Sequence, residues 1–245
     1  SHSIGGVYIY QLLQAGCNVT AVCRSNYSVV SEQGVSLKSV RFGNVNYSPT
    51  NVVRNLSECS SETFDYIMFP GNKPSLAEQL SPMLHGRIST ALVLAQNGIN
   101  VEEEVSAVYP ENPILSGVRY CPATQTGPGT IEYPEMLSCL KLGTYPSTAA
   151  PSHKAAATSF VNLMSEGGGG AEHHEDVVEV IYKRCVEFHL RTDSCDPYAH
   201  DLAWAVMMEI VQLARAVGIP GVTEEVARQM YAITKKRAET GAGRK

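Results

Sequence analysis

A chain of 245 residues with a net charge of −5, 44% hydrophobic residues and 18% charged residues has the composition of a globular protein with one large domain or two small ones. The negative charge, with no clustered Lys/Arg face, argues against a general affinity for nucleic acid or for an anionic membrane. The sequence holds no run of about 18 apolar residues, so we expect no transmembrane helix and no membrane partner.

The seven cysteines have no repeated spacing, and several lie inside apolar runs, as Cys17 and Cys23 do. An odd number of buried thiols favours reduced cysteines over a disulfide framework. We therefore expect a cytoplasmic protein.

The first half of the chain alternates helix and strand patterns. Residues 4–16 predict a helix that ends at Gly16, and residues 18–23 predict a buried strand after it. A short helix is predicted over residues 27–34. Further strands are predicted over 35–49, 64–70, 88–98, 112–126 and 129–133, with a helix over 74–84. This order predicts an α/β fold with a parallel sheet that helices cover on both faces.

From His153 onward the apolar spacing is helical. Helices are predicted over 152–170, 175–188, 197–219 and 222–237, the last with Thr223 as its N-cap. The predicted organisation is a Rossmann-like domain over 1–147, without its first strand, followed by a shortened helical domain over 148–245.

The stretch "SHSIGG", with Gly5 and Gly6, lies where the first helical pattern begins, the place of the phosphate-binding glycine turn in dinucleotide-binding units. Only the last part of a G-x-G-x-x-G motif is present, and His2 occupies the position of the second glycine. The pair is compatible with phosphate binding and equally with a plain tight turn.

Arg24 ends the strand predicted over 18–23, where a dinucleotide-binding unit usually carries an acidic residue for the adenosine ribose. An arginine at this place can pair with the 2′-phosphate of NADP, which an acidic residue would repel. The alternative is a surface arginine that merely follows a strand.

Asn97 lies at the end of another predicted parallel strand, the end at which open α/β sheets bind ligands. Lys73 lies in the turn after the strand predicted over 64–70. Simple turn chemistry explains Asn97, which Gly98 follows, and a solvated loop explains Lys73 equally well.

His173, His174, Glu175 and Asp176 form a cluster that resembles a metal site at first sight. Adjacent histidines do not share a helical face, and no second ligand pair has the spacing of a zinc site. We interpret the segment as a polar loop before a helix and predict no metal.

Several segments, taken in order, resemble the ketopantoate reductase family, and the first of them resembles its fungal members: "SIGGVYIYQLLQAGCNVTAVCRSNY", "NK", "LVLAQNGI", "NPILSGV", "GPGTIEY" and "LGTYP". The resemblance continues more weakly through "VIYKRC" and "VMMEIVQLARAVGIP". It implies a Rossmann domain joined to a helical domain, with the active site in the cleft between them.

The resemblance also implies the reaction, in which NADPH reduces a 2-keto acid to a 2-hydroxy acid. By this resemblance Gly5 and Gly6 serve the pyrophosphate and Arg24 serves the 2′-phosphate, while Lys73 and Asn97 line the cofactor cleft. Lys183 matches the catalytic lysine, whose ammonium group supplies a proton to the keto oxygen. Asn97 is also assigned to the catalytic set.

Two functions remain open at this point. The first is an NADPH-dependent reductase of a 2-keto acid or a related carbonyl compound. The second is a repurposed family member that binds, cyclises or isomerises a small molecule without redox chemistry, because no counterpart of the family's substrate-gripping Ser and Glu is found. In either case we expect a homodimer formed through the helical domain.

Overall fold

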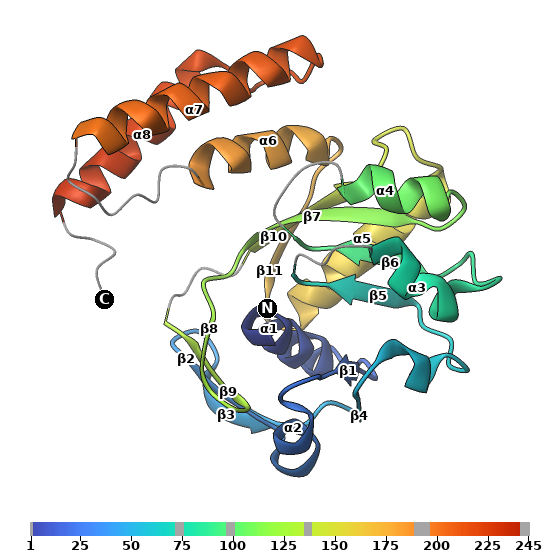
Figure 1. The fold of residues 1–245 in the computed structure, drawn as a ribbon. Coiled ribbons are helices and arrows are strands. Elements are labelled where there is room, and N and C mark those ends of the chain that lie inside the picture. The colour runs from blue at the N-terminus through green and yellow to red at the C-terminus, as the bar shows by residue number, and fades with distance from the viewer. Residues whose placement is uncertain (1, 72–75, 97–100, 135–138, 189–196, 241–245) are drawn as a thin grey trace. The chain divides into compact units, whose positions relative to one another are not determined.

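The computed structural model describes residues 2–71, 76–96, 101–134, 139–188 and 197–240 (Figure 1). Its contacts divide the chain into two compact units, one formed by the described residues up to Val177 and the other by those from Val178 onward. Each unit is described by itself.

The main sheet of the first unit has the strand order β11-β10-β7-β6-β5 among the described residues. Its members are β5 (Tyr66–Phe69), β6 (Ala91–Leu94), β7 (Ile114–Tyr120), β10 (Cys139–Thr144) and β11 (Gly170–His173). Strands β5, β6 and β7 run parallel, β10 is antiparallel to β7, and β11 is parallel to β10. The sheet is therefore mostly parallel, as in a Rossmann-like fold.

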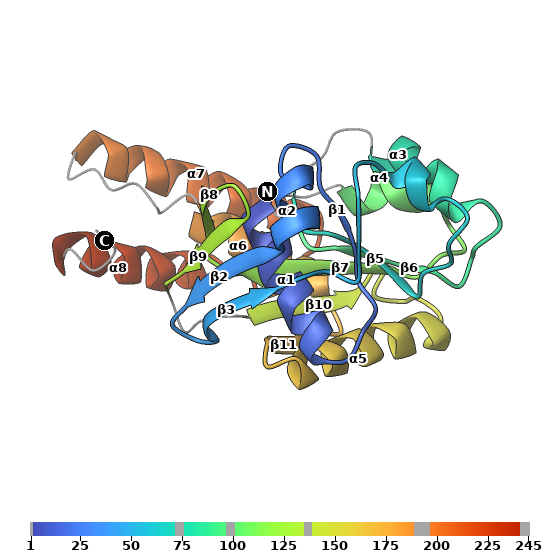
Figure 2. The same ribbon diagram turned by 90° about the horizontal axis from the view of Figure 1, so that it is seen from below.

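Helices cover both faces of this sheet (Figure 2). Helices α3 (Leu76–Leu84) and α4 (Val101–Val108) lie on one face, and α5 (Pro151–Glu166) lies on the other. The side chains of β6 alternate accordingly: Ala91 and Val93 join the core beneath α5, whereas Leu92 and Leu94 join the core beneath α3 and α4. The continuous apolar run of β6 is what burial on both faces requires.

Two smaller sheets complete the described part of the first unit. Strands β1 (Thr20–Val22) and β4 (Asn51–Val53) form a parallel pair. Strands β3 (Gly43–Tyr47), β2 (Val35–Ser39), β9 (Thr130–Tyr133) and β8 (Thr124–Gly127) form a second sheet in that order.

Helix α1 (His2–Gln14) packs against α5 and the second sheet, whereas the short helix α2 (Tyr27–Gln33) packs against β4. A 3-10 turn, η1 (Leu56–Cys59), follows β4. These elements surround the cavity described below.

The second unit is helical in its described part and consists of α6 (Val177–Phe188), α7 (Pro197–Ala216) and α8 (Glu224–Thr240). Its core has members such as Met207, Val211 and Ala227, and the only tryptophan of the chain, Trp204, packs against this core. Within the described ranges, none of the helices combines the length and the apolar character that a membrane crossing requires.

The α/β fold class and the predicted helices are confirmed, and Thr223 caps α8 by accepting a hydrogen bond from the Val226 N–H at 3.3 Å. Three strands were not predicted: β4, β10 and β11. Residues 170–173, interpreted as part of a loop, form β11, because their backbone groups pair with β10. Helix α5 belongs by its contacts to the first unit, whereas the domain boundary at residue 147 stays a prediction.

Candidate functional site

A cavity of about 750 Å³ lies between β1 and β5 in the first unit. The whole of both strands lines it, and α1 contributes residues such as Gly5 and Ile9. Among the described residues, β1 pairs only with β4 and β5 only with β6, so each strand keeps one backbone edge without a strand partner. The cavity therefore combines apolar walls with free backbone hydrogen-bonding groups.

Arg24 follows β1 at its carboxyl end, where the strand pairing with β4 closes with a hydrogen bond from the Cys23 N–H to the Val53 carbonyl oxygen at 2.8 Å. The side chain is exposed and lines the large cavity. It also lines a smaller hollow of about 240 Å³ beside Asn55 and Ser57. An exposed arginine at the carboxyl end of parallel strands is well placed to meet an anionic ligand.

Gly5 and Gly6 line the same cavity as Arg24, but they lie inside helix α1 and not in a turn before it. The expectation of a glycine turn at these two residues is therefore corrected. Gly6 faces Ile131 of β9, and a Cβ atom at position 6 would collide with the Ile131 side chain. The Tyr47 hydroxyl donates a hydrogen bond to the Gly6 carbonyl oxygen at 2.5 Å. The absence of a side chain at Gly6 thus serves the close packing of helix on sheet.

Lys73 and Asn97 lie outside the described residues, so their predicted roles stay predictions. The structure brings Gly5, Gly6 and Arg24 to the wall of one cavity. Of the residues predicted to bind the cofactor, only these three belong to the described part of the chain.

Lys183 lies on α6 in the second unit, where its Nζ donates a hydrogen bond to Glu179 Oε1 at 2.5 Å. The two side chains are four residues apart on one helix face, and each is about one third exposed. The contact is a charge-assisted hydrogen bond between neighbouring turns of one helix. Since a lysine ammonium has three N–H donors, the pair leaves Lys183 able to donate to a second acceptor.

The thiols around the cavity are held in their protonated form. Burial raises the pKa of the Cys23 thiol, and burial also raises the pKa of the Cys17 thiol, with Glu166 and Asp65 adding to the effect. Both residues line the cavity. A protonated thiol is a poor nucleophile, so neither cysteine fits covalent chemistry at neutral pH.

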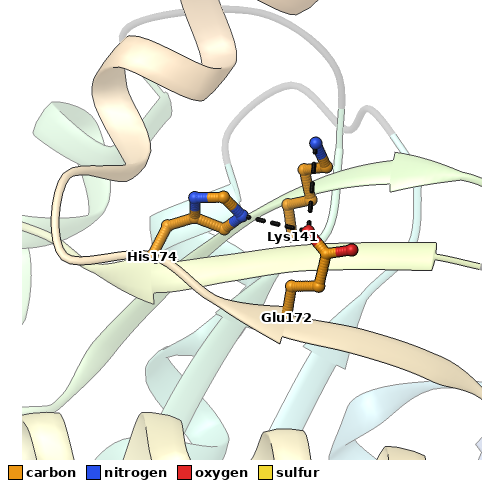
Figure 3. Close-up of polar contacts among 3 residues, drawn as sticks. All are labelled: Lys141, Glu172 and His174. Atoms are coloured by element: carbon orange, nitrogen blue, oxygen red, sulfur yellow. Dashed lines mark hydrogen bonds and ion pairs between the residues drawn. The ribbon is translucent and has the colours of Figure 1, made fainter.

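The acidic and histidine cluster after β10 makes polar contacts along the strand edge (Figure 3). Glu172 lies between His174 and Lys141, with its Oε2 3.4 Å from His174 Nε2 and 3.9 Å from Lys141 Nζ. In the part of the chain that the structure describes, no group of three or more His, Cys, Asp or Glu side chains has the arrangement of a metal site. Burial is the main cause, and the neighbouring Glu172 the second, that raises the pKa of the Cys139 thiol to about 11.

Arg54 is a candidate that the sequence analysis missed. It follows β4 as Arg24 follows β1, and its guanidinium lies over the Tyr27 ring, with Cζ 4.1 Å from the ring centroid. The signal was present in the sequence, since both "TAVCR" and "NVVR" are short β-branched runs that end on arginine.

The described part of the chain has a Rossmann-like α/β fold in its first unit and helices in its second. Residues 1–147 match the family model described as ketopantoate reductase PanE/ApbA. The chain belongs to this family, and the family supports a reductase-like function.

Individual relatives agree with this assignment. The 2-dehydropantoate 2-reductase of Nostoc sp. is 23% identical, over 88% of this chain and 71% of the relative. The crystal structure of 2-dehydropantoate 2-reductase from Methylococcus capsulatus is 26% identical with a TM-score of 0.77, over 95% of this chain and 76% of that one. D-mandelate dehydrogenase in ternary complex with NADH and anilino(oxo)acetate has the same fold, with a TM-score of 0.80 and 17% identity, over 96% of this chain and 77% of that one.

Proposed function

We propose that the protein is an NADPH-dependent reductase of a 2-keto acid or a related carbonyl compound. The observation that carries the proposal is the exposed Arg24 at the carboxyl end of β1, within a chain of the ketopantoate reductase family. The similar dehydrogenase binds NADH together with anilino(oxo)acetate, which carries an oxo group next to a carboxylate. Arg24 is the reason to favour the phosphorylated cofactor here, because its guanidinium pairs with a phosphate.

The residues present fit a dinucleotide in part. Arg24 supplies a cation for the 2′-phosphate, and Gly5 and Gly6 line the same cavity. Lys73 and Asn97 are proposed to complete the cofactor cleft.

Lys183 is the proposed acid of the reaction. NADPH, when bound, supplies the hydride that reduces the carbonyl carbon. The Lys183 ammonium donates a hydrogen bond to the carbonyl oxygen and transfers its proton there as the C–O bond becomes a hydroxyl. Glu179 positions the ammonium through the 2.5 Å hydrogen bond, and water returns a proton to the amine after the transfer.

Calorimetric titration with NADPH, with NADH as the control, tests the cofactor assignment. We expect tight binding of NADPH and weak binding of NADH, and a screen of carbonyl compounds would then follow. Binding of neither dinucleotide would contradict the proposal.

The second candidate is a non-redox member of the family that binds, cyclises or isomerises a small molecule. NADPH consumption in a fixed ratio to the product would exclude this function.

A homodimer formed through the helical unit is also proposed. Leu202, Leu213 and Val217 of α7 and the segment after it are 66%, 45% and 53% exposed, and their spacing of 11 and 4 residues places them on one helical face. Such a face favours self-association. Light scattering should give the mass of two chains, and a monodisperse monomer would contradict the proposal.

A further inference from the structure

One arginine follows each strand of the β1–β4 pair at its carboxyl end, Arg24 after β1 and Arg54 after β4. Thr20 pairs with Asn51 and Val22 with Val53, so the strands run parallel and in step. Arg24 comes directly after the last hydrogen bond of this ladder, and Arg54 comes directly after Val53. Continued by one residue, this register places Arg54 level with Cys23 and Arg24 one residue further along. Paired strands are about 4.8 Å apart, so the two arginines start from neighbouring backbone positions.

The Arg54 guanidinium lies over the Tyr27 ring. Tyr27 is the first residue of α2, and its backbone N–H donates to the Arg24 carbonyl oxygen at 3.3 Å, so the ring belongs to the same turn as Arg24. With Cζ 4.1 Å from the ring centroid, the interaction is a cation–π contact, which occupies no hydrogen-bond acceptor. The N–H groups of the guanidinium therefore stay available for an oxyanion.

Neither guanidinium has an ion-pair partner among the described residues, and both side chains are exposed. The nearby carboxylate of Glu58 accepts hydrogen bonds from the Arg54 backbone N–H at 3.3 Å and from the Asn55 side-chain amide at 2.6 Å. Glu58 is thus engaged by neutral donors of its own turn. Two adjacent cations without counter-charges match the nearly two negative charges of a phosphate monoester.

We propose that Arg54, held on the Tyr27 ring, is a second specificity-determining residue for the 2′-phosphate of NADPH and shares that phosphate with Arg24. The inference rests on the proposed function. The inference adds to the proposed function that Arg54 and Tyr27 contribute, together with Arg24, to the preference for NADPH over NADH.

The test compares dissociation constants of the full chain for NADPH, NADH, adenosine 2′,5′-bisphosphate and ADP by calorimetry. Arg54→Gln should weaken NADPH and the 2′,5′-bisphosphate about tenfold or more and change NADH and ADP less than twofold, because it removes a charged hydrogen bond to the 2′-phosphate only. The control is Lys38→Gln, which removes one exposed positive charge from β2 in the same unit and should leave all four constants unchanged.

Tyr27 needs its own pair of variants, because it acts through Arg54. Tyr27→Phe keeps the ring and should keep the preference for NADPH, whereas Tyr27→Leu should reduce the preference severalfold. Circular dichroism and the thermal midpoint of each variant establish that it folds.

The possible failures are distinct. If the unaltered protein prefers NADPH and Arg54→Gln keeps that preference, Arg54 does not read the phosphate and the inference is wrong while the proposed function stands. An equal loss of NADPH and NADH binding in Arg54→Gln also overturns the inference. If the unaltered protein binds neither dinucleotide, the proposed function fails, and binding of the 2′,5′-bisphosphate over ADP then decides by itself whether the arginine pair recognises a phosphate.

Discussion

The two units are built by different kinds of contact. In the first unit, strands far apart in the chain become neighbours, as when Ser36 of β2 pairs with Thr130 of β9. In the second unit, α7 and α8 follow each other and pack together, and their core is formed within one stretch of chain. Long-range pairing creates strand ends and cavities where ligands bind, whereas consecutive packed helices offer a rigid support for a single side chain.

The charged residues of the proposed site follow the same division. The first unit presents Arg24 and Arg54 without ion-pair partners among the described residues, which suits the binding of an anion. The second unit presents Lys183 paired with Glu179 on α6, which suits the holding of a proton donor. The comparison predicts that cofactor binding and proton transfer can be lost separately.

Replacement of Lys183 should show the largest effect. Lys183→Ala removes the proposed proton donor and should lower kcat about a hundredfold or more, while the dissociation constant for NADPH changes less than twofold. Steady-state kinetics with a carbonyl compound that supports NADPH oxidation measures the first, and calorimetry measures the second. Lys154→Ala is the matched control, since Lys154 is also paired with a carboxylate, 3.2 Å from Glu175, but belongs to the first unit. Full activity of Lys183→Ala would remove this lysine from the mechanism.

A substitution that creates a cavity in the core of the helical unit should have the next largest effect. Met207 is fully buried there, so Met207→Ala should lower the free energy of unfolding by about 2–5 kcal/mol. Trp204 fluorescence reports on this unit alone, because it is the only tryptophan of the chain. Its urea midpoint should fall in Met207→Ala and stay nearly constant in Leu140→Ala, which alters the core of the first unit. Equal shifts in both variants would show that the two units unfold as one.

Alkaline pH should weaken the first unit. Burial raises the pKa of the Cys121 thiol from its usual value of 9.0 to about 12, although the nearby Arg119 charge opposes the shift. The folded state therefore keeps a proton that the unfolded state loses above pH 9, so stability is complete below that pH and declines as the pH rises toward 12. The slope for one such thiol is at most about 1.4 kcal/mol per pH unit.

Urea unfolding followed by circular dichroism at pH 8, 9.5 and 10.5 measures this decline. Cys121→Ser should show a smaller decline than the unaltered protein, because the hydroxyl does not titrate in this range. Identical pH dependence of the two proteins would contradict the assignment to Cys121.

Loss of the α8 cap should have the smallest effect. Thr223→Ala removes the acceptor of the Val226 N–H and should cost about 1 kcal/mol of stability in the helical unit. Thr223→Ser keeps the acceptor and should be nearly neutral. The urea midpoint of Trp204 fluorescence measures both variants, and an unchanged midpoint in Thr223→Ala would show that the cap contributes nothing.

The sequence alone predicted every described helix of more than eight residues, several of the buried strands and the place of Arg24, whereas helix α4 was not predicted. Helices α7 and α8 follow from the 3.6-residue spacing of their apolar side chains and from Thr223, all of which are local features. Arg24 was found because a buried strand ending on a cation is a pattern within a few residues. The Lys183–Glu179 pair was not predicted, although a Glu four residues before a Lys on a helix is a local pattern that indicates such a contact.

Only the tertiary structure decided how the strands pair, and with them the shape of the candidate site. Strands β10 and β11 exist because each finds a backbone partner far away in the chain, and short segments of this kind have no periodicity that distinguishes them from loops. Gly5 and Gly6 have the same sequence signature in a turn as in the first turns of a helix, and the packing of Gly6 against Ile131 settled the matter. Arg24 and Arg54 follow neighbouring strands because β4 pairs with β1, and that pairing joins residues about thirty positions apart through hydrogen bonds that no local pattern encodes.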